Sequence, residues 1–250
     1  MKRPISLLSF LFLLVAASCT KKADPTYGIT KFSFQNKVSG GPLGLNGAAY
    51  TNPAGELYTP KKLLYYISNI ELLGSNGNYA EPNSYHLIDQ SNSASLSFNF
   101  QAPTNTYTSI RFVLGVDSIR NVSGAQTGAL DPLNAMFWTW NSGYIMFKLE
   151  GVAPVSTAPG NIFEYHIGGF KGANNVLKTI TLNFPTAQSV ILNENGTSEI
   201  IIENELNRFW QIPLTLKIAD APLITTPGTL AKSVADNYSD MFSVTQIINN

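Results

Sequence analysis

The sequence predicts an all-β protein, a β-sandwich of about ten strands with long loops and a C-terminal amphipathic helix. Short segments rich in aromatic and β-branched residues recur along the chain, and Gly, Asn and Pro separate them. No segment repeats with the period of about 20 to 50 residues that solenoids and propellers show. Apolar residues with helical spacing occur only near the C-terminal end. A series of short strands without a repeat is typical of a sandwich.

The first eighteen residues are predicted to be a lipoprotein signal peptide. Lys2 and Arg3 provide the positive charge, and the apolar run Ile5 to Val15 is too short to span a bilayer. Small residues, Ala16-Ala17-Ser18, then precede Cys19, the only cysteine of the chain. We therefore expect lipidation at Cys19, which would anchor a domain without a membrane-spanning helix. A plain secretory signal with an incidental cysteine is the alternative.

The predicted organisation is a signal peptide (1–18), a lipidated anchor and linker (19–27) and one domain (28–250). Acidic and basic residues balance at 16 each, and no basic patch indicates nucleic-acid binding. With Cys19 lipidated, no disulfide forms and no thiolate remains for a blue-copper, iron–sulfur or cysteine–zinc site.

The strands are predicted from alternating or continuous apolar runs that end at turn residues. One run, Lys62 to Leu73, is long enough for a helix, but the Ser75-Asn76-Gly77 turn favours a strand that enters a hairpin. The predicted strands are 29–35, 62–73, 85–89, 95–100, 109–116, 136–140, 144–149, 162–167, 177–184, 190–192 and 199–203.

The stretch from Leu130 to Gly151 contains two of the three tryptophans. In an extended Met136–Trp140 segment, Met136, Trp138 and Trp140 would project from one face. The turn Asn141-Ser142-Gly143 would lead to a returning strand that begins at Tyr144. These aromatic side chains either simply fill a core or form a ladder of oxidisable groups on a hairpin.

The segment from Gly228 onward predicts the C-terminal helix. Leu230, Val234, Tyr238 and Met241/Phe242 recur at helical spacing. Such a helix could also cover an exposed sheet edge.

Only two histidines occur, His86 and His166, both in strand-like runs. Histidine is the commonest metal ligand, and its neutral imidazole suits copper. Strand parity places Glu164 on the same face as His166, where it could bind a metal or orient the imidazole. Both histidines could equally be ordinary strand residues. Met136 and Met146 are candidate soft ligands or gap-filling core residues.

No nucleophile motif of the GxSxG type and no HExxH run is present, so we expect a protein that is not an enzyme.

The central segment Met136-Phe137-Trp138-Thr139-Trp140-Asn141-Ser142-Gly143-Tyr144 and the turn Lys148-Leu149-Glu150-Gly151 resemble the MbnP-like copper-binding domain family, which includes Bacteroidetes lipoproteins. Three weaker matches follow the family order. They are 65–69 (Tyr-Tyr-Ile-Ser-Asn), 85–89 (Tyr-His-Leu-Ile-Asp) and 165–169 (Tyr-His-Ile-Gly-Gly). The resemblance extends from about residue 28 to about residue 245.

The resemblance implies a copper site formed by His86 and His166 together with an oxidised tryptophan. Glu164 joins this predicted site through its strand parity with His166. In the family a tryptophan is converted to kynurenine by a dihaem cytochrome c peroxidase of the MauG type, and Trp138 or Trp140 would be that residue here. Asp131, Met136 and Tyr144 support the motif. Some members carry a histidine in the loop equivalent to 121–129, and this sequence has none.

The resemblance to this family also implies where in the cell the protein is located. Surface-exported lipoproteins of this group carry acidic residues after the lipidated cysteine, whereas Thr20-Lys21-Lys22 follows here. We therefore expect an anchor that faces the periplasm, on the outer rather than the inner membrane. The alternative function is a binding module of the same fold that recognises carbohydrate or protein through exposed aromatic side chains.

Overall fold

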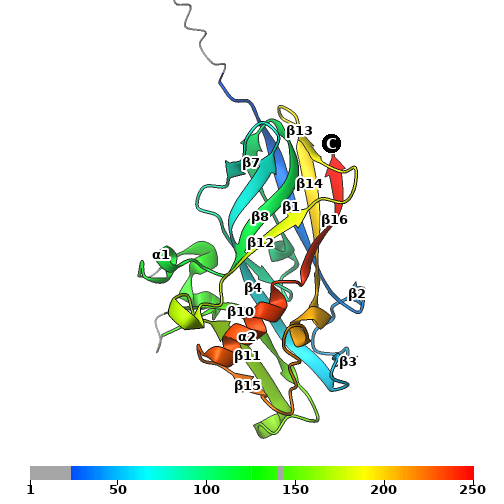
Figure 1. The fold of residues 1–250 in the computed structure, drawn as a ribbon, viewed down its shortest axis with the longest axis vertical. Coiled ribbons are helices and arrows are strands. Elements are labelled where there is room, and N and C mark those ends of the chain that lie inside the picture. Colours follow the sequence, from blue (N-terminus) through cyan, green and yellow to red (C-terminus); the bar gives the residue numbers. More distant parts are fainter. Residues whose placement is uncertain (1–23, 125, 140–142) are drawn as a thin grey trace, which may run out of the picture.

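Two β-sheets pack against each other in the computed structural model, which describes residues 24–124, 126–139 and 143–250 (Figure 1). The all-β prediction is confirmed. The predicted signal peptide, Cys19 and Trp140 lie outside the described residues.

The smaller sheet is built around a long first strand, which runs parallel to β14 and antiparallel to β2 and β7. Strand β16 pairs antiparallel with the other edge of β14. The bounds of these strands are β1 (Tyr27–Val38), β2 (Gly41–Pro42), β7 (Ser97–Pro103), β14 (Thr197–Glu205) and β16 (Phe242–Asn249).

The larger sheet has the order β12-β8-β4-β10-β11-β15, and five further strands pair with members of this path. The path consists of β12 (Lys178–Asn183), β8 (Asn105–Leu114), β4 (Leu57–Gly74), β10 (Gly143–Val152), β11 (Ile162–Gly168) and β15 (Leu223–Ile224). The further strands are β3 (Tyr50–Thr51), β5 (Tyr79–Ala80), β6 (Tyr85–Asp89), β9 (Phe137–Trp138) and β13 (Val190–Leu192).

Helical segments are short, and most are single turns between strands. The α-helices are α1 (Ser118–Asn121) and α2 (Thr229–Tyr238). The 3₁₀ turns are η1 (Ser93–Leu96), η2 (Gly128–Leu130), η3 (Pro132–Asn134), η4 (Pro159–Asn161), η5 (Gly172–Asn174) and η6 (Leu206–Trp210).

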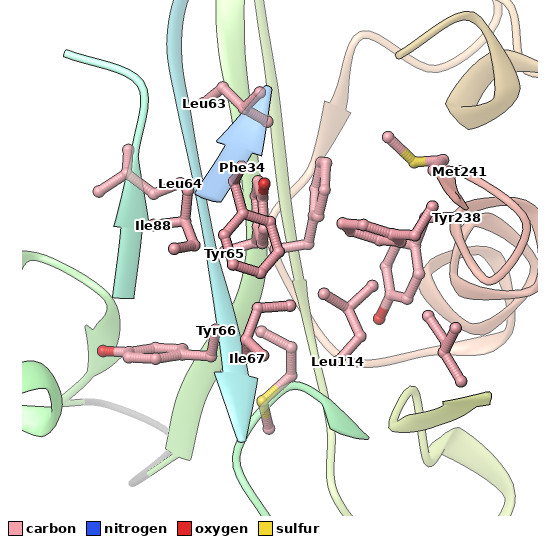
Figure 2. Packing of buried hydrophobic residues seen from close by; sticks show 14 of the residues in the cluster. Phe34, Leu63, Leu64, Tyr65, Tyr66, Ile67, Ile88, Leu114, Tyr238 and Met241 are labelled. Carbon is pink, nitrogen blue, oxygen red and sulfur yellow. The ribbon is translucent and has the colours of Figure 1, made fainter. Parts of the chain in front are cut away.

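The core lies between the two sheets and follows the alternation of the strands. Tyr65 on β4 contacts Phe34 on β1 and Phe242 on β16, with ring centroids 6.3 Å and 5.6 Å away. Figure 2 shows Tyr65 beside Phe34, whereas Tyr66, the next residue, points to the other side of the strand. Strand β4 therefore has an inner face toward the smaller sheet and an outer face away from it.

The smaller sheet does not cover the whole inner face of the larger one. Over β10 and β11 this face is covered by η6 and α2 (Figure 1). Phe147 on β10 stacks on Phe209 of η6 at 5.2 Å and on Tyr238 of α2 at 5.3 Å. The segments η6 and α2 do not cover the opposite, outer face of β10 and β11, and this outer face carries polar side chains.

Two sequence expectations are corrected. The C-terminal helix ends at Tyr238, and Phe242 begins strand β16 instead of continuing the helical spacing. The β-branched residues Val244, Ile247 and Ile248 pair with residues of β14, so the sheet edge determines this segment. The strand predicted to start at Ser95 starts at Ser97, because η1 occupies the preceding residues.

Among the described residues, no helix is long and apolar enough to cross a membrane.

Candidate functional site

A polar cluster occupies the outer face of β4, β10 and β11. In the register of these strands, Lys62 lies opposite Glu150, Glu150 opposite Glu164, and Lys148 opposite His166. Directly opposed residues project from the same face of a sheet. The alternate residues Phe147, Leu149 and Tyr165 are buried on the inner face, so the charged side chains share the outer one.

Glu150 is the centre of this cluster. Its Oε1 lies 2.9 Å from His166 Nε2, and its Oε2 lies 2.8 Å from Lys62 Nζ. The hydrogen bond with His166 lowers the pKa of Glu150 to about 2, burial opposes this shift, and Lys62 adds to it. Glu150 is therefore an anion that holds the His166 ring by one nitrogen.

Lys148 is a buried cation next to this pair. Its ammonium group donates a hydrogen bond to the carbonyl of Ala135, and burial lowers its pKa. Glu150 Oε1 is 3.9 Å from Lys148 Nζ. Because Ala135 precedes β9, this contact attaches the tryptophan-bearing segment to the outer face of the sheet.

His166, Glu164 and Trp138 line one open surface pocket of about 570 Å³, together with Thr225 and Thr226. Strand β15 pairs with β11 in parallel and positions the two threonines. The sequence prediction that Glu164 and His166 share a face is thus confirmed, and the structure adds Trp138 to them.

The Trp138 indole packs closely against β11 at residue 168, which is a glycine. A Cβ atom at Gly168 would lie 2.4 Å from Trp138 Cζ3 and 2.9 Å from the carbonyl oxygen of Tyr144. The indole is 6% exposed as a result. The Gly168-Gly169 pair noted in the sequence therefore has a packing role on the side of the pocket.

We expect Gly168→Ala to displace the Trp138 indole and to lower the free energy of unfolding by about 1 to 3 kcal/mol, because a methyl group is forced into a packed contact. Near-ultraviolet circular dichroism and urea unfolding measure the two effects. Gly47→Ala is the control, since nothing lies within 4 Å of a Cβ atom there. A Gly168→Ala protein indistinguishable from this control would contradict the packing role.

The structure places His86 in a different location. His86 lies opposite Ile67 of β4. His166 lies opposite Lys148 of β10, and Lys148 in turn lies opposite Leu64 of β4. Residues three apart in a strand project from opposite faces, so the two histidines are on opposite faces of the sheet. They are also three strand spacings apart, or about 14 Å laterally.

The His86 side chain contacts Glu81 and Phe98. Its Nε2 lies 2.9 Å from Glu81 Oε2, and its ring stacks on Phe98 with centroids 3.5 Å apart. Phe98 belongs to the smaller sheet, so this stacking joins the two sheets. The predicted metal-binding pair of His86 with His166 is not assembled in this arrangement.

The other predicted residues have structural contacts. Met146 is buried, and its sulfur accepts a hydrogen bond from the Val116 amide at 3.2 Å. Met136 is fully buried. Tyr144 donates to the Leu130 carbonyl at 2.7 Å, and Asp131 caps η3 by accepting the Leu133 amide at 2.9 Å.

The sequence prediction missed the roles of Glu150, Lys62 and Lys148 in this cluster. A usable signal exists, because Lys148/Glu150 and Glu164/His166 each have the i, i+2 spacing of one strand face. The register of β10 on β11 is also required, and the intervening loop that sets it is too long for its turn type to be predicted.

The described ranges contain no group of three or more His, Cys, Asp or Glu side chains able to hold a metal ion. Within the same ranges, Tyr27 is the only aromatic residue with a largely exposed side chain, at 42%. The exposed aromatic surface on which the alternative binding function depends is thus not found in the described part of the chain.

Comparison with known proteins agrees with this architecture. A search of curated proteins finds no match. Among solved structures, MbnP from Methylosinus trichosporium superposes with a TM-score of 0.56 at 14% sequence identity, covering 87% of this chain and 98% of that one. The family model of MbnP matches residues 28–227, so the chain belongs to the MbnP family.

Proposed function

We propose that this protein is a copper-binding lipoprotein of the MbnP family, with its metal site in the pocket formed by His166, Glu164 and Trp138. The observation that carries the proposal is the convergence of these three side chains from two separate segments, β9 and β11, on one pocket. MbnP membership is the second support, since the family is known in copper-related contexts.

The donor set is suited to copper in the cupric state. One imidazole and one carboxylate are nitrogen and oxygen donors, which Cu(II) accepts, whereas Cu(I) prefers sulfur. Both methionine sulfurs of the motif are buried away from this pocket. His166 would bind through Nδ1, because Glu150 already holds Nε2, and such a carboxylate typically orients a metal-binding histidine.

Two donors are fewer than a tight copper site uses, so the proposal includes an oxidised Trp138 as a further donor. Kynurenine carries an amine and a ketone, and both would lie beside His166 and Glu164. Bound copper would supply a one-electron redox centre at this position. We include a dihaem peroxidase of the MauG type as the oxidising partner, and a lipid anchor at Cys19 that faces the periplasm.

The copper test is a competitive titration of protein isolated from its native host. The wild type is expected to bind about one Cu(II) per chain, Glu150→Gln about tenfold more weakly, and His166→Ala more weakly still. His86→Ala is the matched control, since it removes the other histidine from the opposite face. Equal affinity of the wild type and His166→Ala would overturn the proposed site.

A further inference from the structure

Trp138 also lines a second, larger cavity. Its volume is about 670 Å³, within the range of small-molecule sites. Four of the lining residues are aromatic, namely Phe137, Trp138, Tyr144 and Phe170, and Pro132 and Pro227 add to the apolar lining. None of the described residues that line this cavity is acidic.

The walls are held by buried hydrogen bonds. The Asn121 amide oxygen accepts the Tyr144 amide at 2.9 Å, while its Nδ2 donates to two carbonyl groups of the chain. On the opposite side, the Val176 amide donates to the Gly169 carbonyl at 3.0 Å, and Tyr238 of α2 donates to the Val176 carbonyl at 2.8 Å. A cavity with fixed walls needs little reorganisation when a ligand binds.

Lys171 provides the charge of this cavity. Its Nζ lies 5.5 Å from the centroid of the Phe170 ring. Among the described residues, Lys171 forms no ion pair with a carboxylate. The side-chain amide of Asn121 and the hydroxyl of Tyr144 already form hydrogen bonds within the protein. The Lys171 ammonium and the Asn174 amide are the other polar side-chain groups of the lining that a ligand could use.

We propose that this cavity binds a small planar aromatic carboxylate. The ring would lie among Phe137, Trp138 and Phe170, where aromatic pairs gain from offset or edge contacts, and the carboxylate would pair with Lys171. One cation matches a monoanion, whereas a phosphate dianion would keep an uncompensated charge. A carbohydrate would leave most of its hydroxyl groups without partners against apolar walls.

This inference does not depend on the proposed copper site, because His166 and Glu164 do not line the cavity. The two pockets share only Trp138 among their described residues. The test therefore uses the copper-free full chain, and its failure would leave the copper proposal unaffected.

The experiment compares three probes of similar shape by isothermal titration calorimetry: naphthoate, the neutral naphthamide and the cationic naphthylmethylammonium. Naphthoate is expected to bind more tightly than naphthamide, by about fivefold for a partly exposed charge pair, and the cation most weakly. Lack of naphthoate binding, or equal binding of naphthoate and naphthamide, would overturn the proposal.

Variants then assign the selectivity to the residues. Lys171→Ala is expected to weaken naphthoate about fivefold and to leave naphthamide unchanged, and Lys171→Arg should restore naphthoate binding. Phe170→Ala should weaken both probes. Lys217→Ala, which removes an exposed lysine that does not line this cavity, is the control. Naphthoate affinity unchanged in Lys171→Ala would show that the cavity does not select an anion.

Discussion

Replacing Trp210 by alanine is expected to lower the free energy of unfolding by about 4 kcal/mol, the usual cost of truncating a fully buried tryptophan. Trp210 is 0% exposed at the end of η6. Its ring centroid lies 4.9 Å from that of Tyr58, 5.3 Å from Phe209, 5.7 Å from Tyr165 and 6.0 Å from Phe163.

The size of this effect follows from the position of Trp210 in the fold. The smaller sheet leaves the inner face over β10 and β11 to η6 and α2, so Trp210 connects η6 to β4 through Tyr58 and to β11 through Tyr165. A cavity there would weaken the packing of η6 against β11, the strand that carries both His166 and Glu164. We therefore expect weaker copper binding together with the loss of stability.

Urea unfolding measures the change in the free energy of unfolding, and two further variants serve as controls. Trp210→Phe keeps most of the packed volume and should cost clearly less than the alanine variant. Leu133→Ala removes an apolar side chain that is 92% exposed and should change stability by less than about 0.5 kcal/mol. A Trp210→Ala protein as stable as Leu133→Ala would show that η6 does not contribute to the core.

The fold was largely predictable from the sequence because most strands carry their own apolar pattern. Strands β6, β11 and β13 lie where the sequence predicts them, whereas β4 begins at Leu57, before the predicted start at Lys62. Strand β16 was missed because its first residue, Phe242, also continues the helical spacing of α2, and local spacing does not reveal the available edge of β14. The role of Trp210 could not be predicted either, because a single 3₁₀ turn is too short to show a repeating pattern of apolar residues.

For the candidate site, the sequence predicts only how residues are arranged within a single strand. Parity within β11 correctly placed Glu164 beside His166. The contact of His166 with Glu150, however, depends on strand register, and the separation of His86 from His166 depends on the order of β6, β4, β10 and β11. Both are tertiary properties that the spacing of residues along the chain does not contain.

In protein from the native host, we expect oxidation of Trp138 to kynurenine, seen as the mass change for replacing one ring carbon by oxygen. Trp138 lines both the His166 pocket and the cavity beside Phe170, and it is 6% exposed. A partner haem enzyme at this surface would remove electrons from the indole, oxygen from water or dioxygen would open the five-membered ring, and hydrolysis would release the lost ring carbon as formate. Trp140, the other candidate, lies outside the described residues.

Fragmentation of the peptide that contains both residues distinguishes Trp138 from Trp140. Trp138→Phe should abolish the modification and weaken copper binding, because the pocket then keeps only His166 and Glu164 as donors. Expression in a host without a dihaem peroxidase should yield the unmodified tryptophan, and adding the peroxidase gene should restore the change. An unmodified Trp138 in the native host, with that peroxidase present, would remove the oxidised residue from the proposed site and leave His166 and Glu164 to be tested alone.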